Sequence, residues 1–162
     1  MKLEHAKVLV IGGGGFFGSH VVMELLKTNV GEVVIYDNFC RGKREYLETS
    51  LQDDRCYIYD KGGDIRDIDV LSDAMEGKDA VIHLAAMWLL HCNDFPRTAF
   101  HTNIEGTFNV LECCVKHDVK RMVYSSSASV YGDAVAMPMK EDHPFNNRNR
   151  SEEHTFELQS PD

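Results

Sequence analysis

Residues 8–18 read Val-Leu-Val-Ile-Gly-Gly-Gly-Gly-Phe-Phe-Gly, an apolar run followed by a glycine-rich turn. The apolar run predicts a buried strand, and residues with helical spacing follow the turn. The turn satisfies G-x-G-x-x-G through Gly13, Gly15 and Gly18, and G-x-x-G-x-x-G when Gly12 replaces Gly13. Between a strand and a helix, such glycines let a pyrophosphate approach the backbone and present amide groups at the helix N-terminus. A turn that needs positive φ explains one or two glycines but not five in seven, so the stretch predicts a dinucleotide-binding site.

The same alternation of a short apolar run and a stretch with helical spacing repeats through the first 130 residues. Such alternation is typical of parallel strands joined by crossovers in a sheet that helices cover on both faces. We therefore expect an α/β fold, a Rossmann-type doubly wound parallel sheet of which about five strands are present. The expected strands are 8–11, 33–36, 56–59, 80–82 and 121–125, and the expected helices are 19–27, 45–51, 68–75 and 96–117.

The composition argues against several classes of partner. The 162 residues carry 17 Lys and Arg against 26 Asp and Glu, a net charge of −9. Such a negative charge disfavours binding to the phosphate backbone of nucleic acid. No apolar run approaches the roughly 20 residues that span a bilayer, and the first residues lack the layout of a secretory signal. We expect a cytoplasmic protein with no nucleic-acid partner and no membrane segment.

The cysteines indicate neither a disulfide framework nor a metal site. Their number, five, is odd, and no C-x-x-C occurs. The pair His91-Cys92 has no partner pair at ligand spacing, whereas a structural zinc site needs about four convergent ligands. Free thiols and no metal are therefore expected.

An acid stands where a dinucleotide site needs one. Asp37 lies 19 residues after Gly18, directly after the second expected strand, where a carboxylate binds the adenosine ribose hydroxyls. A carboxylate there repels a 2′-phosphate, which favours NAD over NADP. Arg41, Lys43 and Arg44 follow, and they either accept that phosphate in another loop pose or form a solvated basic turn.

Four further motifs lie at or after the later strands. They are residues 63–67 (Gly-Asp-Ile-Arg-Asp), 83–86 (His-Leu-Ala-Ala), 103–107 (Asn-Ile-Glu-Gly-Thr) and 124–132 (Tyr-Ser-Ser-Ser-Ala-Ser-Val-Tyr-Gly). With the glycine turn, they resemble the extended short-chain dehydrogenase/reductase family, and within it the NAD-dependent nucleotide-sugar epimerases and dehydratases such as UDP-glucose 4-epimerase. The resemblance runs from residue 7 to about residue 149.

The resemblance implies a role for each matching position. The glycine turn would line the NAD pyrophosphate, the end of the second strand the ribose, and the end of the third strand the adenine edge. The implied NAD-binding residues are Gly12, Gly15, Phe16, Phe17, Gly18, Asp37, Asn38, Asp64, Ile65, Leu84, Ala85, Ala86 and Asn103. Asn103 would either fix backbone or touch NAD. Ser127, the third serine of its run, matches the catalytic serine or threonine of the family.

One departure leaves the sugar open. Where UDP-galactose 4-epimerases of the best-known type carry a lysine shortly after the fourth strand, this chain has Trp88. Trp88 could stack on a ligand, but its apolar neighbours favour buried packing.

The tyrosine and lysine of the family's reaction are missing. A tyrosinate takes the proton from the sugar hydroxyl, and a lysine four residues later on a helix lowers the pKa of that tyrosine. In the resembling enzymes the pair lies about two dozen residues after the serine, but residues 148–155 here hold neither residue type. A Y-x-x-x-K does occur from Tyr57 to Lys61, but on an extended strand four residues span about 13 Å. We reject it, and expect Tyr57 or Tyr59 to pack on the sheet.

The last residues differ in character from the rest. Residues 150–162 resemble the translation of a common sequencing-library adapter, Arg-Ser-Glu-Glu-His-Thr-Ser-Glu-Leu-Gln-Ser, with Phe156 the one departure within that stretch. We interpret them as a non-native tail. Residues 1–149 are then expected to be an NAD(P)-binding Rossmann domain truncated before Tyr-x-x-x-Lys, the N-terminal half of a longer enzyme.

The function that the resemblance implies is hydride transfer from the sugar C4 to NAD and back, as in a UDP-sugar 4-epimerase. Its substrate would be a nucleotide sugar, and the parent a homodimer built on the long helix. This chain is expected to be inactive without the tyrosine and lysine. Two alternatives stay open, a non-catalytic dinucleotide-binding module and an incomplete domain that does not fold stably. The residues do not separate epimerase from dehydratase, decarboxylase or reductase chemistry. If the domain is incomplete and does not fold stably, an apolar helix face is left uncovered. Its residues are Phe100, Ile104, Phe108, Leu111 and Val115.

Overall fold

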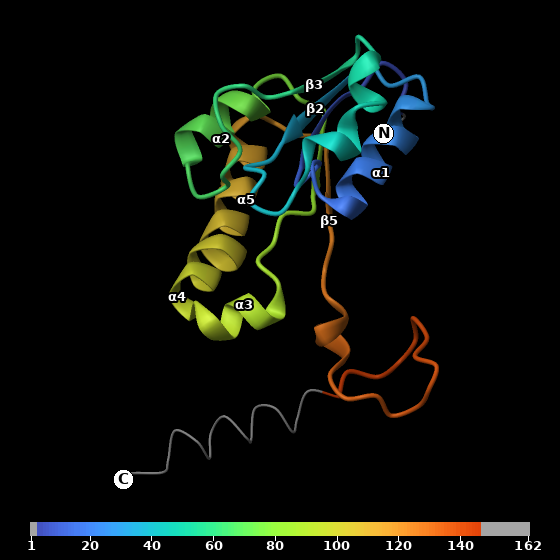
Figure 1. Cartoon of the computed structure of the whole chain (residues 1–162), viewed down its shortest axis with the longest axis vertical. Helices are drawn as coiled ribbons and strands as arrows, with labels where there is room; N and C mark the ends of the chain where they lie inside the picture. The colour runs from blue at the N-terminus through green and yellow to red at the C-terminus, as the bar shows by residue number, and fades with distance from the viewer. Residues whose placement is uncertain (1–2, 147–162) are drawn as a thin grey trace. The chain divides into compact units, whose positions relative to one another are not determined.

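A computed structural model describes residues 3–146 of the chain (Figure 1). These residues form two units, which divide after Ser125 and are each described by themselves. The expected non-native tail, residues 150–162, and the window 148–155 lie outside the described residues.

The first unit contains one five-stranded, all-parallel sheet, as the sequence predicted, and its strand order is β3-β2-β1-β4-β5. Its strands are β1 (Lys7–Ile11), β2 (Glu32–Tyr36), β3 (Cys56–Ile58), β4 (Ala80–His83) and β5 (Arg121–Tyr124). Ile11 lies opposite both Tyr36 of β2 and His83 of β4. The three central strands therefore end at one level, and the loops that follow them share the carboxyl edge of the sheet.

The helices match most of the sequence prediction. They are α1 (Phe16–Leu26), α2 (Ile68–Met75), α3 (Leu89–Asp94), α4 (Pro96–Ala99) and α5 (Gly106–Lys116), with the π-helical η3 (Phe100–Glu105) joining α4 to α5. The prediction of a helix over residues 45–51 is wrong. Two short 3-10 turns occupy that region, η1 (Arg44–Leu47) and η2 (Ser50–Gln52), and η4 (Ala128–Tyr131) is a third in the second unit. Leu47 is buried but Leu51 is exposed, so the segment lacks the continuous apolar face that stabilises a longer helix.

Two apolar layers hold the helices on opposite faces of the sheet (Figure 1). Alternate residues of β1 point to opposite faces. Val8 and Val10 pack with Val22 of α1, whereas Leu9 and Ile11 pack with residues of α2 and α5. The central strands are thus covered on both faces, as expected for a doubly wound sheet.

The last strand departs from that expectation. Val123 and Tyr124 of β5 are each 52% exposed, and β5 is an edge strand that pairs with β4 alone among the described strands. The long helix also leaves the expected apolar face uncovered. Its five residues are 46–80% exposed in the structure: Phe100, Ile104, Phe108, Leu111 and Val115.

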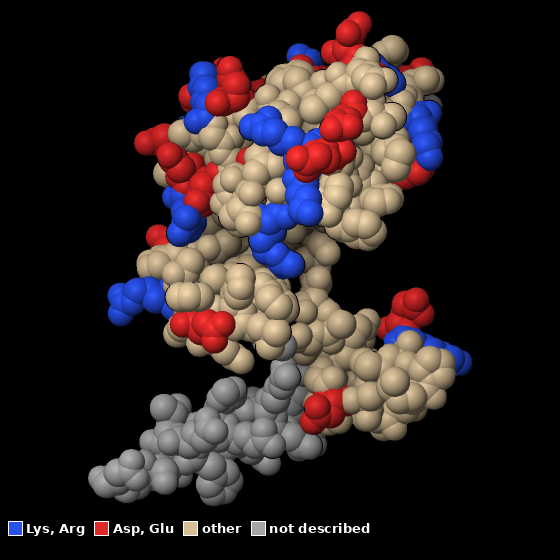
Figure 2. Space-filling view, in the orientation of Figure 1, with Lys and Arg blue, Asp and Glu red and all other residues tan. Residues whose placement is uncertain are grey.

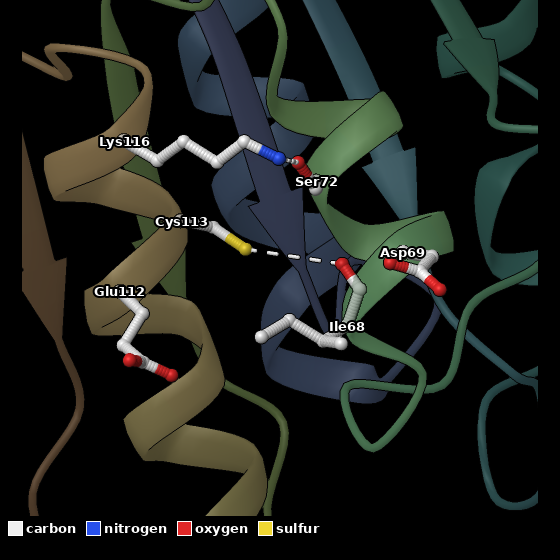
Figure 3. Close-up of a pocket in the computed structure, with 6 residues that line it drawn as sticks. All are labelled: Ile68, Asp69, Ser72, Glu112, Cys113 and Lys116. Carbon is white, nitrogen blue, oxygen red and sulfur yellow. Dashed lines mark hydrogen bonds between the residues drawn. The ribbon is translucent and has the colours of Figure 1, made fainter.

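A groove of about 280 Å³ lies between α2 and α5 (Figure 3). The Lys116 ammonium donates to Ser72 Oγ at 2.8 Å, and His117 Nε2 lies 2.8 Å from the same oxygen. Cys113 lies beside Ile68, with its Sγ 4.0 Å from the Ile68 carbonyl oxygen. These contacts join the two helices, and none of the residues predicted to bind NAD lines the groove.

The described surface carries both signs of charge. Figure 2 shows Lys and Arg side chains gathered in the middle of the face in view, with Asp and Glu side chains beside them. Within residues 3–146, no helix combines the length and the apolar character that crossing a membrane requires.

Candidate functional site

The glycine turn after β1 is pressed against its neighbours. The Gly12 amide donates to the Tyr36 carbonyl at 2.8 Å, and Gly12 has φ +83°. A Cβ on Gly12 would lie 2.7 Å from the Ala85 nitrogen, and one on Gly18 would overlap the Gly12 carbonyl oxygen. Only glycine fits these two positions, so the turn lies flat between β4 and the start of α1.

The start of α1 is open to an anion. Gly15 is the N-cap residue, no side chain caps the helix, and its first turn contains no acidic residue. The first amides of a helix, here those of Phe16, Phe17 and Gly18, have no intrahelical acceptor, and the helix dipole makes this end positive. Over Gly15, a Cβ would have only the Gly12 oxygen, at 3.3 Å, within contact distance. The geometry is that of a phosphate-binding turn.

Asp37 follows β2 and is held in place by backbone amides. Its Oδ2 accepts from the Gly14 amide and its Oδ1 from the Phe39 amide, both at 2.8 Å. A carboxylate offers about four acceptor positions, so each oxygen retains capacity for a further donor. The carboxylate is therefore oriented beside the glycine turn and can still accept from ribose hydroxyls.

Asn38 and Asp64 come together beyond Asp37. Asp64 forms a two-pronged ion pair with Arg66, with Nε–Oδ1 and Nη2–Oδ2 distances of 2.9 and 2.5 Å. Hydrogen bonds from Arg66, and a further one from Asn38, lower the pKa of the Asp64 carboxyl. Ile65 is 3% exposed and its side chain lies in the core. Only its backbone can face a ligand.

The loop after β4 is fixed by Asn103. The Asn103 amide group donates from Nδ2 to the Met87 carbonyl at 2.9 Å, and its Oδ1 accepts from the Met87 amide at 2.7 Å. These bonds are those of the backbone role left open for Asn103, and its contact with NAD stays a prediction. Earlier in this loop, the Leu84 amide donates to the Ile11 carbonyl at 2.8 Å, and the backbone of Ala85 passes Gly12 of the glycine turn. Ala86 follows and is exposed.

His83, at the end of β4, is a buried polar residue to which the sequence reasoning gave no role. It is 0% exposed, with Nε2 3.1 Å from Thr107 Oγ1. Its Nδ1 has no hydrogen-bond partner among the described residues. Burial lowers the pKa of His83 to about 4, so the imidazole is neutral near pH 7. The only signal in the sequence was a polar residue closing an apolar strand.

The prediction that Trp88 packs in the interior is wrong. Trp88 is 40% exposed, and the Arg41 guanidinium carbon lies 5.1 Å from the centre of its ring. Trp88 stands immediately before α3, where it faces the loop after β2 instead of the core. The other two cations of that loop also lie over aromatic rings, Arg44 over Phe39 and Lys43 over Tyr46.

The rejected Y-x-x-x-K does not form a proton relay. The Tyr57 hydroxyl donates to Glu32 at 3.1 Å, whereas Lys61 lies 3.9 Å from Asp73. Tyr57 is 42% exposed. Tyr59 does pack on the sheet, with its ring 5.9 Å from that of Tyr36.

Ser127 belongs to the second unit. It is the N-cap residue of η4, and its Oγ accepts from the Ser129 amide at 3.2 Å. Its side chain is exposed. Since this unit is described by itself, the catalytic role of Ser127 stays a prediction.

Comparisons with known proteins agree with this geometry. A profile of the 3-beta hydroxysteroid dehydrogenase/isomerase family matches residues 9–159. The Pisum sativum bifunctional UDP-glucose 4-epimerase and UDP-xylose 4-epimerase 1 is 37% identical over 152 residues, which cover 88% of this chain and 42% of that protein. This chain therefore spans less than half the length of that relative.

Two solved structures share the fold. A UDP-glucose 4-epimerase from Stenotrophomonas maltophila, with bound NAD and formylated UDP-arabinopyranose, has a TM-score of 0.76 at 29% identity, covering 95% of this chain and 48% of its own. A dTDP-glucose 4,6-dehydratase from Streptomyces venezuelae, with NAD and TYD bound, has a TM-score of 0.77 at 33% identity, covering 86% of this chain and 45% of its own.

Proposed function

Because the chain belongs to the extended short-chain dehydrogenase/reductase family, as a member similar to the NAD-dependent UDP-glucose 4-epimerases, we propose that its first unit binds NAD. The observation that carries the proposal is the glycine turn between β1 and the uncapped start of α1, with Asp37 oriented beside it. NAD would lie across the carboxyl ends of β2, β1 and β4, where doubly wound sheets bind their ligands.

The residues present fit the parts of NAD. The first amides of α1 would hold the pyrophosphate, and the free acceptor capacity of Asp37 would hold the adenosine ribose. Asp64 and the backbone of Ile65 would meet the adenine, and Ala85 and Ala86 would offer a close backbone surface. Asn103 contributes by fixing Met87, which positions the loop after β4. Bound NAD supplies the hydride acceptor.

For a full-length protein that carries this chain, we propose a nucleotide-sugar epimerase or dehydratase, most simply a UDP-sugar 4-epimerase. In it, Ser127 would hydrogen-bond the reacting sugar oxygen, and the uncovered face of α5 would meet a second copy in a homodimer. The chain itself contains no tyrosine after Tyr131. We therefore expect no turnover of a UDP-sugar panel by the chain, because a serine hydroxyl cannot replace a tyrosinate with its pKa near neutrality.

A calorimetric titration of the 162-residue chain with NAD tests the binding proposal. We expect saturable binding, weaker binding of NADP, and a loss of NAD affinity of about tenfold or more in Asp37→Ala, since hydrogen bonds to charged groups contribute about 1.5–3 kcal/mol. The ratio of NAD to NADP affinity should fall in the same variant. A chain that unfolds cooperatively yet shows no saturable NAD binding would refute the proposal.

The boundary at residue 149 is tested separately. Resequencing the source DNA across that codon, by a method without the adapter, should reveal a reading frame that continues into Tyr-x-x-x-Lys. Recovery of codons 150–162 as printed, in independently prepared material, would instead support a dinucleotide-binding module without catalysis.

A further inference from the structure

Arg41 and Trp88 connect two loops that are far apart in the sequence. Arg41 lies in the loop after β2 and Trp88 in the loop after β4, and β2 and β4 flank β1 on its two sides. The Arg41 guanidinium carbon lies 5.1 Å from the centre of the Trp88 ring. Because the three strands end at one level, the pair bridges the carboxyl end of β1, where the glycine turn begins.

The loop after β2 is anchored on that turn. The Lys43 amide donates to the Gly14 carbonyl at 2.9 Å. A Cβ on Gly42 would lie 2.8 Å from the Gly14 carbonyl group, and one on Gly14 would lie 2.6 Å from the Phe39 ring. Arg41 is therefore held between residues that are packed against the turn.

The other end of the bridge is also fixed. Asn103 holds both backbone polar groups of Met87, the residue immediately before Trp88. The Trp88 ring also lies 5.1 Å from the ring of His91 in α3. The indole thus offers a positioned aromatic face, the surface on which a guanidinium stacks favourably.

Arg41 keeps its hydrogen-bonding capacity, unlike two other arginines of the first unit. Arg55 and Arg66 each make a two-pronged contact with a neighbouring carboxylate, Asp53 and Asp64. Within residues 3–146, Arg41 makes no ion pair and no hydrogen bond, and its guanidinium lies over the Trp88 ring. A guanidinium has five N–H donors in a plane that matches phosphate oxygens.

We propose that Arg41, positioned by the Trp88 ring, lies over the glycine turn and donates hydrogen bonds to the pyrophosphate of the bound dinucleotide. We call this contact between Arg41 and the pyrophosphate the clasp. This inference rests on the proposed NAD binding and deepens it. The first amides of α1 would hold the pyrophosphate from one side and the guanidinium from the other. Trp88 acts as a positioning residue, because its ring sets where the guanidinium lies.

The test compares Arg41→Gln with Arg44→Gln in the full 162-residue chain. Arg44 is a matched control, since it begins η1 directly after this loop and also sits over an aromatic ring, that of Phe39, at 4.6 Å. We expect Arg41→Gln to weaken binding of NAD and of ADP-ribose about tenfold or more. Binding of adenosine, which has no phosphate, should not change. Arg44→Gln should leave NAD affinity within about twofold, as for a charge without a direct contact.

Three further measurements separate the clasp from a structural effect. Arg41→Gln should melt at the same temperature as the unmodified chain without ligand, and its NAD affinity should depend less steeply on salt. Trp88→Phe, which keeps a ring, should bind NAD more tightly than Trp88→Ala.

The outcomes are distinct. If the unmodified chain does not bind NAD, the proposed function fails. If it binds NAD and Arg41→Gln binds equally well, the clasp alone is refuted. A loss confined to NADP would also refute it, because Arg41 would then read the 2′-phosphate and not the pyrophosphate.

Discussion

Strands β1 and β5 have similar apolar character but different surroundings. The four residues of β1 from Val8 to Ile11 are all 0% exposed, whereas Val123 and Tyr124 of β5 are each 52% exposed. β1 pairs with β2 and β4 and has helices on both faces, while β5 pairs only with β4 among the described strands. Apolar character therefore predicts a strand, but the neighbours decide how much of that strand is buried.

The difference extends to the loops at the strand ends. Backbone hydrogen bonds join the loop after β2 to the glycine turn and the start of the loop after β4 to β1, and the Asp37 carboxylate accepts from the Gly14 amide. Asn103 of η3 separately holds Met87 in the loop after β4, so the proposed cofactor site has rigid walls. Rigid walls favour ligand binding because less freedom is lost when the ligand arrives. Perturbations at β1 and its turn should accordingly have larger effects than matched ones at the edge of the sheet.

The largest expected effect is that of Gly12→Ala at the end of β1. Left-handed strain of about 1–2 kcal/mol and overpacking against Ala85 of about 1–3 kcal/mol together lower the free energy of unfolding by about 2–5 kcal/mol. NAD binding should disappear with it. Chemical denaturation and calorimetry measure the two effects.

Gly77→Ala is the control for backbone strain. Gly77 has φ +67° with nothing within 4 Å of a Cβ, so it should lose only about 1–2 kcal/mol. Equal losses in the two variants would show that the approach of the glycine turn to β4 contributes nothing.

The next largest loss of stability is expected when buried β1 and exposed β5 are each truncated to alanine at one position. Leu9→Ala removes a fully buried side chain of β1 and should cost about 3 kcal/mol. Val123→Ala, on the exposed β5, should cost less than about 1 kcal/mol. Denaturant titrations of both variants provide the measurement, and similar losses would contradict the role given to the neighbours.

An effect of similar size, spread over a pH range, should appear at His83 in β4, the strand between β1 and β5. Its pKa in the folded state is about 4, below the usual value of 6.5, so the unfolded chain binds the proton first. Above pH 6.5 neither state is protonated, and between pH 6.5 and 4 stability falls by a total of about 3 kcal/mol as the pH falls. The stability difference between the unmodified chain and His83→Gln should shift by that amount. A difference that does not change with pH would show that His83 is not buried as a neutral group.

Much of the fold could be predicted because its signals are local. The alternation of apolar runs and helical spacing gave the five strands and their parallel sheet, and the glycine spacing gave the turn. The segment 45–51 failed because one buried leucine, Leu47, is too little apolar surface to decide between a helix and short turns.

The positions of Asp37 and Asp64 could be predicted because each follows a strand, and their roles toward NAD stay predictions. The site could not be predicted where a role depends on a contact across the sheet. Arg41 over Trp88 joins loops from two strands that are not consecutive in the chain, and spacing carries no information about such a meeting.

The sequence by itself determined the succession of strands and helices along the chain, the glycine turn between β1 and α1, and the position of the acid after β2. These features follow from periodicity and from the backbone freedom of glycine, which act over a few neighbouring residues. Only the tertiary structure decided that Asn103 holds Met87, that Trp88 is exposed beneath Arg41 and that side chains of β5 are half exposed. Those outcomes depend on which distant segments become neighbours, and the physical reason is that burial and side-chain contact are properties of the packed sheet and not of any single stretch of chain.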